Sequence, residues 1–275
     1  MTPLEKYPKL AEALGLGGLY FKREDLHPYG SHKGRSIPVM IDHYYSQGDR
    51  HFAISSSGNA ALAAALYVQE LNSKKQAGID LDILVGQHVS PKKLAKLREI
   101  EKRVGSDSIR ILSKERPLQA LTQAVQEGKR SLRQSTDDIA LVGYESLAAE
   151  LAGTKSIGAV FIGTSSGTTA QALCQYFEKN KSPIQVHIVQ TSACHPLADQ
   201  FENYDGPQEE SLADAIVDQT ALRRPALIPH IKQTGGYAWV ATNDDIENSL
   251  DLVAKHTAIE ISTNSALSVA GAIQA

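Results

Sequence analysis

Short apolar segments that alternate with helix-forming segments restrict the fold more than any other feature of this sequence. The segments FAIS, LDILVG, SIRILS, IGAVFIG and IQVHIVQT have the length and composition of buried strands. Alanine-rich or amphipathic stretches such as AALAAALYVQEL and LQALTQAVQEG separate several of them and favour helices. Because strands that alternate with helices pair in parallel, the sequence predicts an α/β protein whose twisted, parallel-type sheets are flanked by helices.

The length and charge of the chain narrow the class of protein. At 275 residues the chain is longer than one typical domain, so we expect one large α/β unit or two coupled lobes. The net charge of -3 and the absence of a block of like charges argue against nucleic acid or a membrane surface as a partner. The N-terminal stretch has no apolar signal-peptide core, and no apolar run is long enough to span a bilayer. We therefore expect a cytoplasmic protein that acts on small molecules.

The cysteines and histidines do not predict a metal site. Cys174 and Cys194 cannot form a disulfide framework, so reduced thiols are expected. Cys194 adjoins His195, and His187 lies a few positions earlier, which suggests zinc. Neighbouring residues rarely point at one tetrahedral centre, however, and the sequence offers no second Cys/His pair.

Local patterns predict further elements. IALVG and AIEIS, at residues 139–143 and 258–262, are interpreted as strands, each followed by a polar turn and a helix. Residues 192–236 have weak periodicity, and a long irregular stretch in an α/β protein is usually functional or connects lobes. Helix caps are expected at Ser31, at Ser90, and at Thr242, which forms a capping box with Asp245.

Three loops rich in serine, threonine or glycine each lie between an apolar segment and a helix, at residues 55–59, 163–169 and 262–265. In doubly wound sheets such loops lie at the carboxyl ends of the strands, where ligands bind, so we expect them to converge. The loop GTSSGTT is the best candidate for an anion site, because its small residues let backbone N–H groups face a phosphate at a helix N-terminus. It matches neither a Walker A loop nor a dinucleotide-binding fingerprint. Taken alone, it is equally well interpreted as an ordinary turn and helix cap.

The segment YFKREDLHPYGSHKGR places Lys33 just after a turn that contains Pro28 and Gly30. Most lysines are solvated surface charges, and Lys33 alone would be interpreted in that way. A lysine held beside a phosphate-binding helix terminus is partly desolvated, which favours the neutral amine that forms a Schiff base with an aldehyde. Pyridoxal phosphate needs such an amine, a phosphate site, a donor for its ring oxygen and a partner for its ring nitrogen.

Several of these segments together resemble the pyridoxal-phosphate enzymes of fold type II. The resemblance rests on KREDLHPYGSHKGR, SSSGNAALAAA and GTSSGTTAQAL, and extends to TPL, GYESLAAEL and AIEISTNSALSVAGA. It spans nearly the whole chain and follows the order of the family's motifs. This superfamily includes threonine synthase, the threonine and serine dehydratases, cysteine synthase and the tryptophan synthase β chain. The resemblance implies a two-lobed, tryptophan synthase β-like fold.

The resemblance also implies a role for each matching residue. Lys33 corresponds to the catalytic lysine that holds pyridoxal 5'-phosphate as a Schiff base and then moves the α-proton of the substrate. Asn59 corresponds to the asparagine that binds the cofactor ring oxygen. The loop that binds the substrate carboxylate corresponds to Ser56, Ser57 and Gly58. The phosphate-binding loop corresponds to Gly163, Thr164, Ser165, Ser166, Gly167 and Thr168, with serines at two positions where many relatives have glycine.

The partner of the cofactor ring nitrogen is Thr263 or Ser265 in this resemblance, because the family commonly uses a hydroxyl there. Family members usually continue by a further strand and helix beyond this segment, whereas this sequence ends at Ala275. If the natural chain is longer, the partner is expected beyond this end, and Thr263 and Ser265 are scaffold. A neutral hydroxyl partner suits elimination or replacement at the β or γ carbon rather than transamination.

Other residues near the motifs have two interpretations. His32 matches the Ser-His-Lys version of the lysine motif, and it is expected either to reach the cofactor phosphate or to pack behind the turn. Tyr144, Arg223 and Arg224 are candidate substrate contacts, although structural or surface roles are the simpler interpretation.

The function that the resemblance implies is β/γ-elimination or replacement on a small amino acid by a pyridoxal-phosphate-dependent lyase, most similar to threonine synthase or a dehydratase. One alternative is a β-replacement synthase of the cysteine or tryptophan type. Another is a non-catalytic family member that binds cofactor or a metabolite. The resemblance also implies a homodimer.

We expect two lobes. Residues 42–138 form the smaller lobe, which carries the SSSGN substrate loop. Residues 1–41 plus 139–275 form the larger, cofactor-binding lobe, which carries Lys33 and the phosphate loop. Substrate binding is expected to draw the SSSGN loop toward the cofactor.

Overall fold

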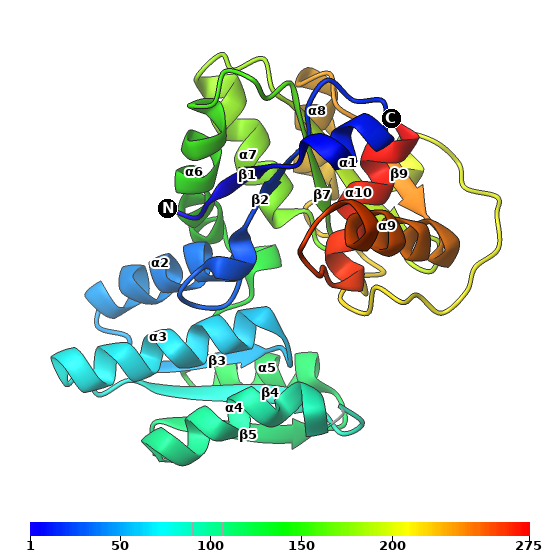
Figure 1. Ribbon diagram of the computed structural model, residues 1–275. Coiled ribbons are helices and arrows are strands. Elements are labelled where there is room, and N and C mark those ends of the chain that lie inside the picture. The colour runs from blue at the N-terminus through cyan, green and yellow to red at the C-terminus, as the bar shows by residue number, and fades with distance from the viewer. Residues whose placement is uncertain (90, 106) are drawn as a thin grey trace. The chain divides into compact units, whose positions relative to one another are not determined.

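The chain divides into two compact units (Figure 1). Unit 1 comprises Met1–Pro3 and Arg23–Gly143, and unit 2 comprises Leu4–Lys22 and Tyr144–Ala275. The structure is a computed structural model that describes residues 1–89, 91–105 and 107–275, so Ser90, a predicted helix cap, lies outside the described residues. None of the described helices is long and apolar enough to cross a membrane.

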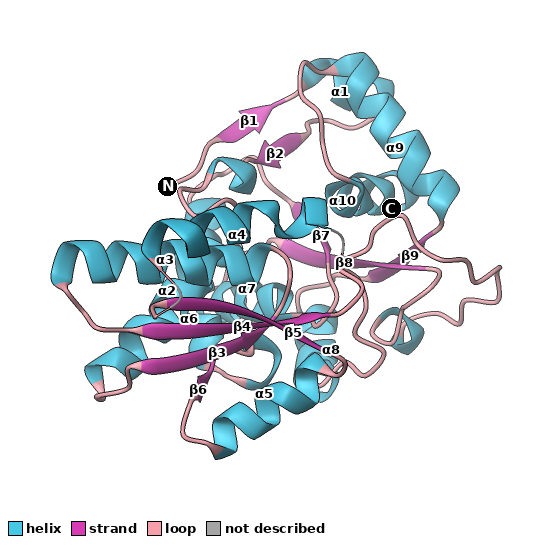
Figure 2. Cartoon of the chain, turned by 90° about the horizontal axis from the view of Figure 1, so that it is seen from below, coloured by secondary structure: helices cyan, strands magenta, loops and turns pink. Residues whose placement is uncertain are grey.

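Unit 1 is built on a four-stranded parallel sheet with the order β5-β4-β3-β6 (Figure 2). Its strands are β3 (His51–Ser55), β4 (Asp80–Gly86), β5 (Ile109–Lys114) and β6 (Arg130–Ser131). Its main helices are α2 (Lys33–Ser46), α3 (Asn59–Lys75), α4 (Pro91–Val104) and α5 (Pro117–Gln126). The parallel α/β organisation predicted from the sequence is confirmed.

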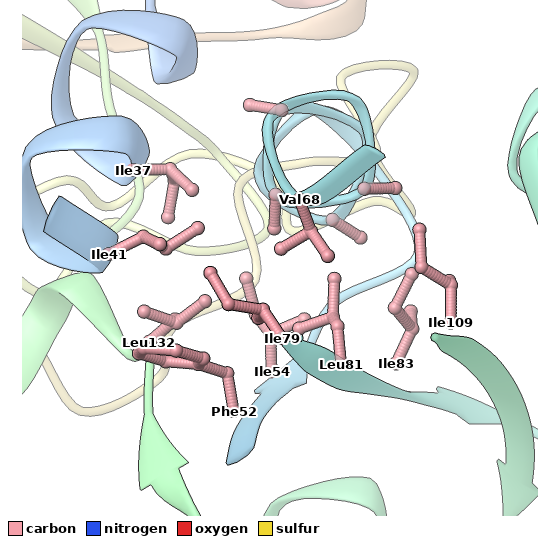
Figure 3. Close-up of a cluster of buried hydrophobic side chains, with 14 of the residues drawn as sticks. Ile37, Ile41, Phe52, Ile54, Val68, Ile79, Leu81, Ile83, Ile109 and Leu132 are labelled. Atoms are coloured by element: carbon pink, nitrogen blue, oxygen red, sulfur yellow. The ribbon is translucent and has the colours of Figure 1, made fainter. Parts of the chain in front are cut away.

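Apolar side chains from both sides of the unit 1 sheet make its core. Figure 3 shows Ile37 and Ile41 of α2 and Val68 of α3 beside strand residues such as Ile54 and Leu81. Helix α4 contributes to the same cluster, whereas α5 packs on the opposite face of the sheet. Burial of each large aliphatic side chain is worth about 1.5–3 kcal/mol, so this cluster is a main source of the stability of unit 1.

The segment IALVG forms the start of helix α6 (Ile139–Ala152), so its interpretation as a strand is wrong. Ala140 and Leu141 of this segment are buried by helix packing, and Ala140 belongs to the core of unit 1. Ser36 of α2 donates through Oγ to the carbonyl oxygen of Ala140 at 2.8 Å. A Cβ atom on Gly143 would lie 2.4 Å from Ser36 Cα and 2.6 Å from the carbonyl oxygen of Arg35. Glycine therefore lets α6 approach the backbone of α2.

Unit 2 contains a three-stranded parallel sheet with the order β7-β8-β9 and an antiparallel pair, β1-β2. The strands are β1 (Leu4–Lys6), β2 (Tyr20–Lys22), β7 (Ala159–Gly163), β8 (Gln185–Thr191) and β9 (Ala238–Ala241). The helices are α1 (Pro8–Ala13), α7 (Thr168–Lys179), α8 (Arg224–Gln233), α9 (Asn243–His256) and α10 (Thr263–Gln274).

Helix α10 packs directly on the unit 2 sheet. Val189 of β8 shares a buried cluster with Leu267 of α10 and Ile246 of α9. A Cβ atom on Gly271 would lie 2.4 Å from Val189 Cγ2, so glycine permits the close approach of α10 to β8. Because side chains alternate along a strand, Gln190, the next residue of β8, points to the opposite face. This alternation decides which side chains of β8 reach the loop after β7.

Two local predictions in unit 2 have opposite outcomes. The capping box is confirmed, since Thr242 Oγ1 accepts from Asp245 N at 3.2 Å and Thr242 N donates to Asp245 Oδ2 at 2.8 Å. The strand predicted at residues 258–262 is wrong, because this segment is irregular. Ile259 and Ile261 are partly buried and pack against a cluster that contains helix residues, and this apolar packing explains the strand-like sequence.

The structure divides the chain at different residues from the predicted lobe boundaries. Residues 23–41 belong to unit 1. The physical reason is that Ile37, Met40 and Ile41 of α2 pack into the core of this unit. Lys33 therefore lies in the same unit as the SSSGN loop, and the GTSSGTT loop lies in unit 2.

We expect Gly143→Ala to destabilise the protein by about 2 kcal/mol. An added methyl group would meet the backbone of α2, and overpacking of this kind costs about 1–3 kcal/mol, which exceeds the gain of up to about 1 kcal/mol in helix propensity. Urea unfolding of the two proteins measures the difference. Gly158→Ala is the matched control, because a Cβ atom there meets nothing within 4 Å. Equal unfolding midpoints for Gly143→Ala and the natural protein would contradict the packing described above.

Candidate functional site

A tight turn leads into Lys33, the first residue of α2. The backbone N–H of Gly30 donates to the carbonyl oxygen of His27 at 2.8 Å, and Gly30 has a φ of +81°, which favours glycine. Gly34 allows the His27 ring to lie against the start of the helix, since a Cβ atom on Gly34 would be 2.5 Å from His27 Cε1. The turn predicted at Pro28 and Gly30 is thus confirmed, and it fixes the backbone that carries Lys33.

The N-cap residue of α2 is His32, so the prediction of Ser31 as the cap is wrong by one residue. Ser31 Oγ instead accepts a hydrogen bond from the backbone N–H of Lys33 at 3.3 Å. Loss of hydration lowers the pKa of His32 from its ordinary 6.5 to about 3. The positive charges of Lys33, Arg35 and His27 lower this pKa further, with the largest effect from Lys33 and the smallest from His27. His32 is therefore neutral at pH 7, with one ring nitrogen as donor and the other as acceptor.

An ion pair holds the segment before Lys33 against α2. Arg35, which is buried, donates through Nε and Nη2 to the two carboxylate oxygens of Glu24 at 2.7 and 2.8 Å. Arg35 Nη2 also donates to Thr2 Oγ1 at 2.9 Å, which ties the TPL segment to the same point. Removal of one partner of a buried ion pair costs about 3–5 kcal/mol, so these contacts strongly favour one placement of the helix start.

The SSSGN loop connects the end of β3 to the start of α3. Gly58 is the N-cap of α3, and its backbone N–H donates to Ser56 Oγ at 3.2 Å. Asn59 is the first helical residue and is exposed, while Ser57 is partly exposed. Their side chains are therefore accessible to a ligand at the N-terminus of α3, where backbone N–H groups favour an anion.

Unit 1 brings the Lys33 turn to the first turn of α3. A Cβ atom on Gly30 would lie 3.2 Å from Leu62 Cδ2, so the turn touches the residue one helical turn after Gly58. Helices α2 and α3 also share the core of the unit. Two of the predicted groups, the lysine segment and the SSSGN loop, thus belong to one packed assembly.

The GTSSGTT loop connects the end of β7 to the start of α7, as predicted. The backbone N–H of Thr164 donates to the carbonyl oxygen of Val189 at 2.9 Å, and Thr164 Oγ1 accepts from Gly167 N at 3.0 Å. Gly167 has a φ of +82°, which turns the chain into the helix and requires glycine. Ser166 Oγ lies 2.9 Å from Thr168 Oγ1. The loop is closed by its own hydrogen bonds.

Ser165 joins this loop to the irregular part of unit 2. Its Oγ accepts from the backbone N–H groups of Val217 and Asp218 at 3.1 and 3.0 Å, and donates to Asp218 Oδ2 at 2.8 Å. Ala213 and Ile216 of the same segment are buried in the cluster that contains Val189. Ser165 therefore has a structural role in holding residues 213–218, and its hydroxyl is already committed to protein groups.

Gln190 holds the GTSSGTT loop through hydrogen bonds to its backbone, and the sequence analysis did not predict this role. This side chain is fully buried on β8. Its Nε2 donates to the carbonyl oxygens of Thr164 and Ser165 at 3.4 and 3.3 Å, and its Oε1 accepts from Leu197 N at 2.8 Å. The signal was a glutamine that directly follows the apolar residues Ile188 and Val189, because a buried amide needs partners.

The start of α10 lies beside the GTSSGTT loop within unit 2. The backbone N–H of Gly163 donates to Ser268 Oγ at 3.1 Å, and a Cβ atom on Gly163 would lie 2.9 Å from the carbonyl oxygen of Asn264. Ser265 Oγ lies 3.0 Å from Oγ of the N-cap residue Ser262. Thr263, the first residue of α10, is partly exposed. Two of the three predicted loops of the chain thus meet in this unit.

The residues considered for zinc make other contacts. The His187 ring stacks on Phe161 with centroids 4.5 Å apart, and its Nδ1 accepts from Trp239 Nε1 at 3.2 Å. His195 Nδ1 donates to the carbonyl oxygen of Thr191 at 3.0 Å. Aromatic packing and backbone contacts account for these histidines.

The donors of the GTSSGTT loop fit a phosphate group. The first N–H groups of a helix have no acceptor within that helix, and α7 begins at the loop. Because Ser166 and Thr168 share one hydrogen bond, one hydroxyl hydrogen of this pair is left as a side-chain donor at the same point. The α7 macrodipole adds partial positive charge, so the loop provides both donors and field for an anion.

A model of the pyridoxal-phosphate dependent enzyme family matches residues 1–275. The chain belongs to this family. Pyridoxal phosphate is therefore its cofactor, and the resemblance drawn from the motifs is confirmed.

Curated relatives of this family member include threonine synthases. That of Methanosarcina acetivorans is 39% identical over 66 residues, which cover 24% of this chain and 16% of the relative. That of Methanocaldococcus jannaschii is 24% identical over 288 residues, which cover 98% of this chain and 68% of the relative. The match to the first of these relatives thus spans well under two thirds of its length.

Solved structures with the same fold include enzymes of different reaction classes. A pyridoxal 5'-phosphate-dependent aspartate racemase superposes with a TM-score of 0.81 at 20% identity, covering 99% of this chain and 83% of that chain. The processed form of threonine deaminase isoform 2 from Solanum lycopersicum superposes with a TM-score of 0.79 at 20% identity, and the match covers 99% of this chain and 73% of that chain. These likenesses establish the fold type II architecture.

We expect the free energy of unfolding to decrease as the pH falls from about 6.5 toward about 3, because His32 is harder to protonate in the folded chain than in the unfolded chain. An unfolded histidine takes up a proton below pH 6.5, whereas the folded chain resists protonation until about pH 3, so acid favours unfolding. The thermal midpoint should therefore fall more steeply for the natural protein than for His32→Asn between about pH 7 and pH 4. Exposed His88 supplies the control His88→Asn, which should keep the natural slope. Parallel curves for the natural protein and His32→Asn would refute this account.

Proposed function

We propose that this family member uses Lys33 to bind pyridoxal phosphate as a Schiff base and to move the α-proton of a small amino acid. The observation that carries the proposal is the position of Lys33 as the first residue of α2, behind a turn fixed by glycine and by the Glu24–Arg35 ion pair. A lysine on such a rigid support is suited to directional proton transfer. The cofactor supplies the electron sink that makes the α-proton acidic.

The other predicted site residues take the remaining tasks in this proposal. Asn59 binds the ring oxygen of the cofactor, and Ser56, Ser57 and Gly58 bind the substrate carboxylate at the N-terminus of α3. The exposure of Asn59 and the cap geometry of Gly58 support these roles. The neutral imidazole of His32 offers an additional donor near Lys33. The phosphate is held by residues 163–168, chiefly through backbone N–H groups and the hydroxyl of Ser166.

The proposed reaction class is elimination or replacement at the β or γ carbon, as in threonine synthase or a dehydratase. The hydroxyls at the start of α10 support it, because a neutral partner of the ring nitrogen disfavours transamination. Thr263 is the better of the two candidates, since Ser265 Oγ lies within hydrogen-bond distance of Ser262 Oγ. Relatives named threonine synthase and a structural neighbour named threonine deaminase agree with this class.

Replacement of Lys33 tests the proposed cofactor attachment. The purified protein with pyridoxal phosphate is expected to have the visible absorbance of a Schiff base, and Lys33→Ala should abolish that band, because no amine remains at this point. Lys9→Ala, at an exposed lysine, is the control and should keep the band. A band of natural intensity in Lys33→Ala would overturn the role of Lys33.

A substrate panel tests the reaction class. L-Serine, L-threonine, O-acetylserine and O-phosphohomoserine are added in turn while absorbance and products are followed. Release of a keto acid or formation of threonine supports the proposal, and product formation only with O-acetylserine and a nucleophile favours a β-replacement synthase. Change in substrate chirality without product would replace the proposal by racemisation. A coloured protein that leaves all four compounds unchanged would favour a non-catalytic member.

A further inference from the structure

Arg223 lies beneath the first turn of α7 and directly contacts the GTSSGTT loop. Only 6% of its surface is exposed. Its Nε donates to Thr168 Oγ1 at 3.2 Å, and its Nη1 donates to Gln171 Oε1 at 3.1 Å. Arg223 immediately precedes α8, so a residue from the irregular part of unit 2 reaches the start of the helix.

The contact with Arg223 determines which hydroxyl donates in the hydrogen bond between Thr168 and Ser166. A guanidinium group only donates, so Thr168 Oγ1 accepts from Arg223. A hydroxyl that accepts from a cation becomes a stronger donor, and the hydroxyl of Ser166 lies 2.9 Å from Thr168 Oγ1, within hydrogen-bond distance. With Thr168 donating to Ser166, the hydrogen of the Ser166 hydroxyl is directed away from Thr168 and toward a ligand in the loop.

The charge of Arg223 also opposes the ordinary pattern at a helix end. Cations stabilise the C-terminus of a helix, whereas this guanidinium lies at the positively polarised N-terminus of α7. A buried positive charge at this position adds to the helix field, and the combined field favours an anion at the loop. A dianionic phosphate group would be the favourable counter-charge.

We propose that Arg223 is a positioning residue for the cofactor phosphate, acting through Thr168 and Ser166 to orient hydroxyl donors at the loop. This inference rests on the proposed phosphate site at residues 163–168. The effect is expected to be specific to the phosphate group, because Arg223 contacts Thr168 at the start of α7, where the loop that holds the phosphate ends. A residue that merely stabilised the fold would affect every ligand of the protein alike.

The test compares two ligands that differ only in the phosphate group. The apoprotein is titrated with pyridoxal 5'-phosphate and with pyridoxal, and binding is followed by Schiff-base absorbance and by fluorescence of the single tryptophan, Trp239. Loss of a hydrogen bond to a charged group corresponds to about tenfold in affinity. We therefore expect Arg223→Gln to weaken pyridoxal phosphate about tenfold and to leave pyridoxal unchanged. Arg224→Gln, at the exposed neighbour, is the matched control.

Two further variants keep the test decisive. Thr168→Val removes the acceptor while Arg223 stays, so it should reproduce the selective loss if Arg223→Gln fails to fold. In Arg223→Gln combined with Ser166→Ala, the loss should be smaller than the sum of the single losses, because both act through one chain of hydrogen bonds. Equal weakening of both ligands, unchanged binding of pyridoxal phosphate, or additive losses would overturn the inference. A folded natural protein that binds no pyridoxal phosphate would instead overturn the proposed function.

Discussion

Parallel pairing within each sheet is the constraint on which both units depend. In unit 1 the strands β3, β4 and β5 run in the same direction, and the SSSGN loop leaves the carboxyl end of β3. In unit 2 the loops after β7, β8 and β9 all leave the same edge of the sheet. Because each loop ends in a helix N-terminus or a turn, each unit presents backbone N–H groups at one edge. The SSSGN and GTSSGTT loops, to which the proposed function assigns the substrate carboxylate and the cofactor phosphate, lie at these edges.

Polar side chains then hold the loops in shape. Gln190 and Ser165 in unit 2 and Arg35 in unit 1 each join segments that are distant in the sequence. A buried polar group without a partner costs about 1–3 kcal/mol, so such side chains specify one loop conformation when all their partners are in place. Over residues 1–89, 91–105 and 107–275, no buried side-chain nitrogen or oxygen lacks a hydrogen-bond partner. Within each unit, the loops of the candidate site are therefore held by hydrogen-bonded side chains.

Much of this organisation could be predicted from the sequence because it depends on local patterns. Strand and helix periodicity predicts the parallel sheets, and the Thr242 capping box is confirmed by its hydrogen bonds. The errors at residues 139–143 and 258–262 arose where apolar residues are buried by helix packing, which has no period-2 signature distinct from that of a short strand. Contacts such as those of Arg223 with Thr168 and Gln171 join an irregular segment to a helix, and no local pattern encodes such a pairing.

The central claim is that Lys33 carries the cofactor. Borohydride reduction of the protein with bound pyridoxal phosphate converts the Schiff base to a stable amine, and peptide mass mapping locates the modified lysine. The account predicts one modified peptide, containing Lys33. A modification at another lysine, or a folded protein that retains pyridoxal phosphate but yields no modified peptide, would contradict it.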